Sequence, residues 1–289
     1  MITNFIIAWR ETLEIGLIIS IVFSYLKKTG QKQYLRTVWL AIGLGIVVCV
    51  AAGILLYNLT TGFSGRAEKI FEGITMLVAA VLITSMIVWL LRQKNIAKKL
   101  ELSLEKTINS KRSWELFLLV FFSILREGIE MVILLQAATL VDSKNNLSGI
   151  LLGAALSLVL CLSIYYFSLK LNLKKFFLYT SIFLILFAGG LVAHGLHELN
   201  EANILPPLIQ EIWDINPVVN LDGSFPWWHE KGTIGSLLTG LFGYNGNPSL
   251  LEVIGYVTYI VFTYFIWKRY SHPLNPPVAF TQKKQLSPD

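Results

Sequence analysis

Seven long apolar stretches, separated by polar segments, set the pattern of the chain. A membrane-spanning helix needs about 20 mostly apolar residues, so each stretch predicts one transmembrane helix. The predicted spans are residues 4–26, 38–59, 68–91, 115–140, 148–169, 176–197 and 250–268. We therefore expect an all-α integral membrane protein. Its single polytopic domain covers residues 1–269, and a disordered cytoplasmic tail covers residues 270–289.

The composition agrees with this pattern and narrows the class of protein. Of the 289 residues, 54% are hydrophobic and 15% are charged, whereas a soluble domain carries about 25% charged residues. The two cysteines, Cys49 and Cys161, lie in apolar surroundings, which excludes a disulfide scaffold and a thiolate metal site. No basic run precedes the first apolar stretch, so we expect a first transmembrane helix rather than a cleaved signal peptide.

The basic residues predict the orientation of the spans. Eighteen of the 24 Lys and Arg residues lie in the segments after the first, third, fifth and seventh spans. Only Arg66, Lys69, Lys144 and Lys231 lie in the opposite segments. Because cytoplasmic loops are enriched in Lys and Arg, we expect the N-terminus outside and the C-terminus inside. The basic side then faces anionic lipid, so the net charge of +6 does not indicate a nucleic-acid partner.

Two charged runs lie inside predicted spans. They are Arg10-Glu11-Thr12-Leu13-Glu14 in the first span and Arg126-Glu127-Gly128-Ile129-Glu130 in the fourth. A charged side chain at the centre of a spanning helix costs about 2.5–3.5 kcal/mol on insertion scales. These six side chains must therefore pair with one another, line a polar path or hold a ligand.

The two runs predict an inverted repeat. The first and fourth spans run in opposite directions, and Glu14 and Glu130 each lie roughly 18–20 Å from the exit of their span, at about 1.5 Å per residue. Both therefore fall near the middle of a hydrocarbon core of about 30 Å. We expect the first three spans and the next three to be inverted halves, with the seventh outside the repeat.

The spacing of the runs suits the binding of a hard cation. Residues three and four apart share a helix face, so each Arg lies on the face of its two Glu residues. Four carboxylates and two guanidinium groups would carry a formal charge of −2, and carboxylate oxygens suit hard cations. Arg10 and Arg126 would be counter-charges of the empty site. The alternative is that the runs are two structural ion-pair clusters joining the spans.

A second polar group is expected at the outer surface. Glu68 and Glu72 begin the third span, and His194, His197 and Glu198 end the sixth. We expect these five side chains to meet an incoming cation, with Glu201 and Glu252 nearby. The alternative for this outer group is a set of solvated helix ends. The acidic segment 198–249, rich in Pro and Trp, predicts an ordered, partly interfacial outer loop.

Paired Arg-Glu-x-x-Glu runs in the first and fourth of seven spans resemble the high-affinity iron permease family, the oxidase-dependent iron transporters of fungi and bacteria. The likeness covers most of the chain. It extends to Glu68-Lys69-Ile70-Phe71-Glu72-Gly73, to Ala193-His194-Gly195-Leu196-His197-Glu198, and to Gly235-Ser236-Leu237-Leu238 followed by Gly240-Leu241-Phe242-Gly243-Tyr244. Threonine and leucine separate the glutamates of the first motif, where glycine and isoleucine separate those of the second.

The resemblance implies an iron permease of the cytoplasmic membrane, a transporter and not an enzyme, without a prosthetic group. Glu11, Glu14, Glu127 and Glu130 would bind iron on its way into the cell. An all-carboxylate site favours ferric iron, and ferrous iron stays open. The resemblance also implies a partner outside the membrane that is a separate chain: an iron oxidase, a peroxidase or an iron-binding protein. A homo-oligomer stays open as well.

Two other functions compete with iron transport. A carrier of another metal, or a proton-coupled exporter, could use the same carboxylates, in the latter case as proton relays. An intramembrane di-iron oxidase is the third candidate, but such bundles use Glu-x-x-His pairs. None of the four His residues follows a Glu at that spacing, which speaks against the oxidase.

Overall fold

The computed structural model describes residues 2–92, 102, 104–105, 112–141, 147–167, 173–206, 209–220 and 222–271, and these residues contain helices and no strand. The long helices are α1 (Ile2–Lys28), α2 (Leu35–Gly62), α3 (Arg66–Arg92), α5 (Ser113–Val141), α6 (Leu147–Phe167), α7 (Leu173–Glu201) and α9 (Leu250–Ser271). A 3-10 turn, η1 (Lys32–Tyr34), precedes α2, and a short helix, α8 (Thr233–Phe242), precedes α9. Each predicted span coincides with one long helix, except that residues 168–169 lie outside the described part. Most of the predicted tail, Lys144 and most basic residues between the third and fourth spans also lie outside it.

Among the described residues, four helices are long and apolar enough to cross a membrane. They contain the stretches Lys32–Gly62, Arg66–Leu91, Phe177–Glu201 and Leu250–Arg269. Helices α1 and α5 are of similar length, with 27 and 29 residues, but their charged runs separate them from this set. Helix α6 offers a shorter apolar stretch, Leu147–Ser163. The structure therefore fits a membrane protein, and the count of seven spans stays a prediction.

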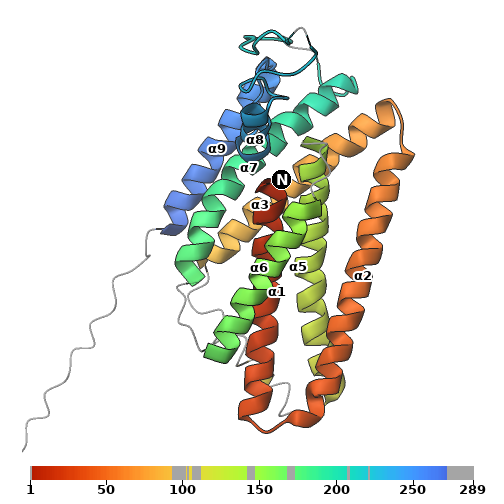
Figure 1. The fold of residues 1–289 in the computed structure, drawn as a ribbon, viewed down its shortest axis with the longest axis vertical. Coiled ribbons are helices and arrows are strands. Elements are labelled where there is room, and N and C mark those ends of the chain that lie inside the picture. The colour runs from red at the N-terminus through yellow and green to blue at the C-terminus, as the bar shows by residue number, and fades with distance from the viewer. Residues whose placement is uncertain are drawn as a thin grey trace, which may run out of the picture.

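The helices pack in pairs around a central contact between α1 and α5. Helix α6 lies along α1, α2 lies along α5, and α3 lies along α7, with α9 also against α7. In Figure 1, α1, α2, α5 and α6 run roughly upright, and α3, α7 and α9 are inclined to them. One apolar core joins α3, α5 and α7 through residues such as Ile83, Leu134 and Phe187. A second joins α1, α2 and α5.

Small residues bring the paired helices close together. On α6 they recur every four residues at Gly153, Ser157 and Cys161, which contact α1; on α2 they are Gly45, Cys49 and Gly53, which contact α5. A methyl group at Gly153 would lie 2.5 Å from the carbonyl oxygen of Phe5. Small residues at this spacing let helix backbones approach each other within a membrane. The small residues of α6 and α2 therefore let these two helices pack closely against α1 and α5.

Two glycines also bring the backbones of α3 and α7 into close contact. A Cβ atom at Gly73 would lie 2.9 Å from the carbonyl oxygen of Gly195, and a Cβ atom at Gly195 would lie 3.0 Å from that of Gly73. Neither position accepts a side chain without separating the helices. This contact lies about one turn from polar residues of both helices, such as Lys69 on α3 and Glu198 on α7.

The segment predicted as an outer loop contains a helix that the sequence analysis did not foresee. Helix α8 ends at Gly243, whose φ of 69° is the left-handed conformation that glycine adopts readily after a helix. Gly243 packs directly against Gly190 of α7, and Thr3 Oγ1 donates a hydrogen bond of 2.6 Å to the carbonyl oxygen of Gly240. The segment between α7 and α9 therefore folds back onto the start of α1 and the middle of α7.

Candidate functional site

The Arg10 side chain binds both glutamates of its own motif. Its Nη1 donates to Glu11 Oε1 at 2.7 Å and also to Met86 Sδ, and its Nη2 lies 2.7 Å from Glu14 Oε1. The side chain is 1% exposed, and its guanidinium carbon lies 5.8 Å from the centre of the Phe177 ring. Because an Arg fork can hold two carboxylates at once, one buried cation neutralises much of the first motif.

Arg126 repeats this arrangement in a more open setting. Its Nε donates to Glu130 Oε1 at 3.1 Å and lies 3.5 Å from Glu127 Oε1. Its guanidinium carbon lies 5.1 Å from the centre of the Trp89 ring. This side chain is 46% exposed, whereas that of Arg10 is 1% exposed. The two motifs therefore have the same contacts but different access.

Packing of α1 against α5 brings the two motifs together. Carboxylate oxygens of Glu11, Glu14 and Glu127 all lie within 4.8 Å of one another, which is close enough for one metal ion to contact all three. Glu130, the fourth glutamate predicted for this site, is not in the group and stays with Arg126. The two helix faces therefore meet, with three of the four glutamate side chains in one group.

Two oxygen atoms of this carboxylate group have no partner. Among the described residues, Glu11 Oε2 and Glu127 Oε2 are buried and accept no hydrogen bond, and Arg10 Nε is a buried donor without an acceptor. Leaving a buried polar group unsatisfied costs about 1–3 kcal/mol, and more for a charged group. Oxygen ligands of this kind suit a hard cation.

Each of the two motif helices packs against a free cysteine from a neighbouring helix. Cys49 of α2 packs its sulfur against Gly128, inside the second motif, and Cys161 of α6 packs its sulfur against Gly16, just after the first. Both thiols are buried. In each case the glycine leaves room that the sulfur fills, so the thiols act in packing rather than as ligands of the carboxylate group.

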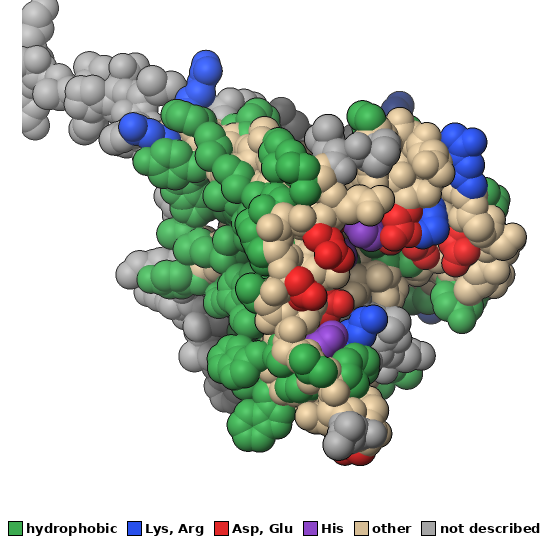
Figure 2. Space-filling model, turned by 90° about the horizontal axis from the view of Figure 1, so that it is seen from above, with side chains coloured by type: hydrophobic (Ala, Val, Ile, Leu, Met, Phe, Trp, Pro, Cys, Tyr) green, Lys and Arg blue, Asp and Glu red, His purple; other side chains and the backbone are tan. Residues whose placement is uncertain are grey.

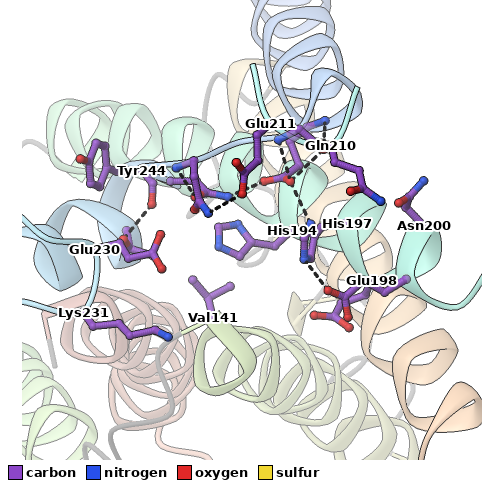
Figure 3. Close-up of a pocket in the computed structure, with 16 residues that line it drawn as sticks. Val141, His194, His197, Glu198, Asn200, Gln210, Glu211, Glu230, Lys231 and Tyr244 are labelled. Carbon is purple, nitrogen blue, oxygen red and sulfur yellow. Dashed lines mark hydrogen bonds and ion pairs between the residues drawn. The ribbon is translucent and has the colours of Figure 1, made fainter. Parts of the chain in front are cut away.

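A polar cavity of about 750 Å³ opens among α7, α9 and the segment between them. In the view from above, Asp, Glu and His side chains gather around a hollow in this face (Figure 2). Three of the five residues predicted for the outer group, His194, His197 and Glu198, line the cavity, whereas Glu68 and Glu72 do not. Figure 3 shows the His194 ring directed into the cavity. His194 Nδ1 lies 3.0 Å from the carbonyl oxygen of Gly190, which directs Nε2 elsewhere and leaves it as a potential ligand.

Glu252 organises the wall of this cavity. Its Oε1 accepts hydrogen bonds from His197 Nδ1 at 2.9 Å and from the hydroxyl and amide of Ser249 at 2.9 and 3.2 Å. Its Oε2 accepts a bond of 2.7 Å from Asn245 Nδ2. Four donors on a carboxylate that is 2% exposed make Glu252 a structural anchor. It ties α9 and the 245–249 segment to α7.

Sequence reasoning missed several residues of both sites. Met86, Trp89 and Phe177 contact the two arginines from α3 and α7, and nothing in an apolar span distinguishes them from core residues. Glu211 and Glu230 line the outer cavity, and their signal was only the acidic character of their segment. In the part of the chain that the structure describes, the outer cavity holds no group of three ligand atoms as close as the carboxylate group in α1 and α5.

Known iron permeases are similar to this chain over most of its length. The model of the iron permease FTR1 family matches residues 1–271. The chain is 33% identical over 265 residues to the ferrous iron permease EfeU of Yersinia pestis, covering 90% of this chain and 91% of that protein. It is 31% identical over 268 residues to the ferrous iron permease EfeU of Escherichia coli O6:K15:H31, covering 90% and 93%. No solved structure matches. The chain belongs to the iron permease FTR1 family, whose members are transporters and not enzymes.

Proposed function

We propose that this protein moves iron into the cell across the cytoplasmic membrane through a site near the membrane midplane. Glu11, Glu14, Glu127 and Glu130 supply its oxygen ligands. The observation that carries this proposal is the group of three carboxylates contributed by α1 and α5, with two buried oxygens that lack partners. The family and the names of the relatives supply the identity of the ion.

The arginines act as exchangeable counter-charges. Arg10 and Arg126 neutralise the carboxylates before iron arrives, through the contacts described above. A multiply charged cation that binds Glu11, Glu14 and Glu127 displaces the guanidinium groups from the oxygens it takes. Arg126 is the freer of the two and moves first, because it is half-exposed and Arg10 is enclosed. Release follows when the guanidinium groups return.

The pairing of helices supports the predicted inverted repeat of α1–α3 and α5–α7. Exchanging the two halves turns the pair α1 and α6 into the pair α5 and α2, and both pairs are in contact. It also exchanges Arg10 over Phe177 of α7 with Arg126 over Trp89 of α3. In such repeats, access to a central site alternates as one half moves against the other. We place α9 outside the repeat, the N-terminus outside the cell and the C-terminus inside.

Iron reaches the midplane site from the outer cavity. His194, His197 and Glu198 line the cavity, and Glu68 and Glu72 lie on α3 beside it. A separate oxidase, peroxidase or iron-binding protein delivers the ion there. Ferric iron suits the carboxylate site because it is the harder ion, whereas the relatives are named for ferrous iron. Uptake of radioactive iron kept ferrous with ascorbate, compared with ferric citrate, decides between the two.

Uptake by glutamate variants tests the proposal. Glu14→Gln and Glu130→Gln should abolish uptake of radioactive iron in cells that lack other iron importers, while the protein is still made and folded. The matched control is Glu115→Gln on α5, which removes a carboxylate outside both motifs and should transport normally. Wild-type uptake by both motif variants would mean that the charges only join the helices. Competition by manganese or zinc that equals competition by unlabelled iron would instead indicate a general metal carrier.

A further inference from the structure

A lysine pairs with two of the acidic side chains at the outer cavity. Lys69 of α3 forms an ion pair with Glu201 and lies 4.0 Å from Glu198 Oε2. Both glutamates line the cavity, and Glu201 Oε1 also lies 3.1 Å from His197 Nε2. The Lys69 ammonium group therefore contacts the same carboxylates that an incoming cation would meet.

The contact between α3 and α7 determines the position of Lys69. Lys69 lies four residues before Gly73, and Glu198 lies three residues after Gly195. These two glycines are in backbone contact, since a Cβ atom on either would lie 2.9–3.0 Å from the facing carbonyl oxygen. Residues three or four apart lie on one helix face. The α3–α7 contact thus determines which carboxylates Lys69 reaches.

Stability alone accounts poorly for the position of this charge. An ion pair between partly exposed side chains contributes about 0–1 kcal/mol, and Lys69, Glu198 and Glu201 are all partly exposed. A protonated lysine is a compact cation on a flexible stem, and it offers no lone pair to a metal. Its presence lowers the affinity of the cavity for any cation that needs the same oxygens.

We propose that Lys69 is a tethered cation that competes with the cargo for Glu198 and Glu201 and so sets the selectivity of the outer cavity. A multiply charged ion displaces the ammonium group, because it gains more from two carboxylates and an imidazole than the lysine does. A monovalent ion does not displace it. This inference rests on the proposed function only in that the cargo is a metal cation. It assigns to the outer cavity the role that Arg10 and Arg126 have at the midplane site.

Metal binding to the purified full chain tests the role of Lys69. The double variant Glu14→Gln, Glu127→Gln removes the midplane site, so that titration with Mn²⁺, followed by electron paramagnetic resonance, reports on the outer cavity. In this background Lys69→Met should tighten Mn²⁺ binding about tenfold, which corresponds to about 1.4 kcal/mol, and Lys69→Arg should leave it weak. High concentrations of K⁺ should weaken Mn²⁺ binding more in Lys69→Met than in the parent.

Lys231 provides the matched control, since it lines the cavity that Lys69 reaches through Glu198 and Glu201. Lys231→Met removes the same charge and should tighten Mn²⁺ binding by less than threefold. Equal gains from both variants, or no gain from Lys69→Met, would overturn the proposal, as would parent binding that Glu198→Gln leaves unchanged. Lys69→Gln, checked by its melting temperature, substitutes for Lys69→Met if that variant does not fold. Failure of the proposed function would appear separately, as normal iron uptake by Glu14→Gln.

Discussion

The carboxylates of Glu14 and Glu127 lie within 4.8 Å of each other, although the two residues come from different helices and different halves of the chain. Two like charges this close repel each other unless cations intervene. Arg10 supplies one such cation through its contact with Glu14 at 2.7 Å. The outer cavity repeats the scheme with Lys69 between Glu198 and Glu201. Each acidic group on the proposed iron path thus carries a positive side chain of its own.

Arg10 should contribute more to stability than Arg126. Arg10→Met leaves Glu11 and Glu14 buried without their counter-charge, and removing one partner of a buried ion pair costs about 3–5 kcal/mol. Arg126→Met removes a half-exposed cation, whose contacts are less buried than those of Arg10. Thermal unfolding of both variants in detergent should show a clearly larger fall in melting temperature for Arg10→Met. Equal shifts would contradict the difference in burial seen here.

The crossing of α3 and α7 should not tolerate a methyl group. Gly73→Ala places Cβ 2.9 Å from the carbonyl oxygen of Gly195, and overpacking of this kind costs about 1–3 kcal/mol. Gly43→Ala on α2 is the control, because no atom lies within 4 Å of its Cβ position. That control should be neutral or stabilising by about 0.5–1 kcal/mol, since alanine favours helix. Melting temperatures measure both effects, and a neutral Gly73→Ala would show that the helices do not meet there.

The glycine of the second motif should depend on the cysteine behind it. Gly128→Ala drives its methyl group into the Cys49 sulfur and should shift α5, so iron uptake and melting temperature both fall. Replacing the sulfur in the double variant Gly128→Ala, Cys49→Ala should recover part of both losses. A double-mutant cycle should give a coupling of about 0.5–3 kcal/mol, as expected for residues in contact. If the free-energy changes of the two single variants simply add up in the double variant, the two residues are not in contact.

Glu252 should hold the outer segment in place. Glu252→Ala removes the acceptor for His197, Ser249 and Asn245, and we expect the segment between α7 and α9 to become more mobile. Limited proteolysis should cut it at least several-fold faster than in the wild type. Glu211→Ala is the control, because Glu211 accepts only an exposed bond of 3.5 Å from Asn247 among its described contacts. Similar cleavage rates in the two variants would remove the anchoring role.

The sequence by itself determined the helices and the chemistry of their charged runs. The length of each apolar stretch alone located each long helix. A spanning helix makes all its backbone hydrogen bonds within one segment, so it appears in the sequence as one continuous apolar stretch. The three- and four-residue spacing within each motif also fixed that Arg10 meets Glu14 and that Arg126 meets Glu130. Both contacts are local and follow from helix geometry. The predicted orientation and span count rest on the same local record and stay predictions.

Only the tertiary structure decided which charges meet across helices. It places Glu127 with Glu11 and Glu14 and leaves Glu130 with Arg126, because this depends on the rotation of α5 against α1. That rotation is set by contacts distant in sequence, such as Cys49 against Gly128 and Cys161 against Gly16. The unequal burial of the two arginines, helix α8 and the hydrogen bonds of Glu252 arise in the same way. Local periodicity specifies a helix face, but only packing specifies what that face touches.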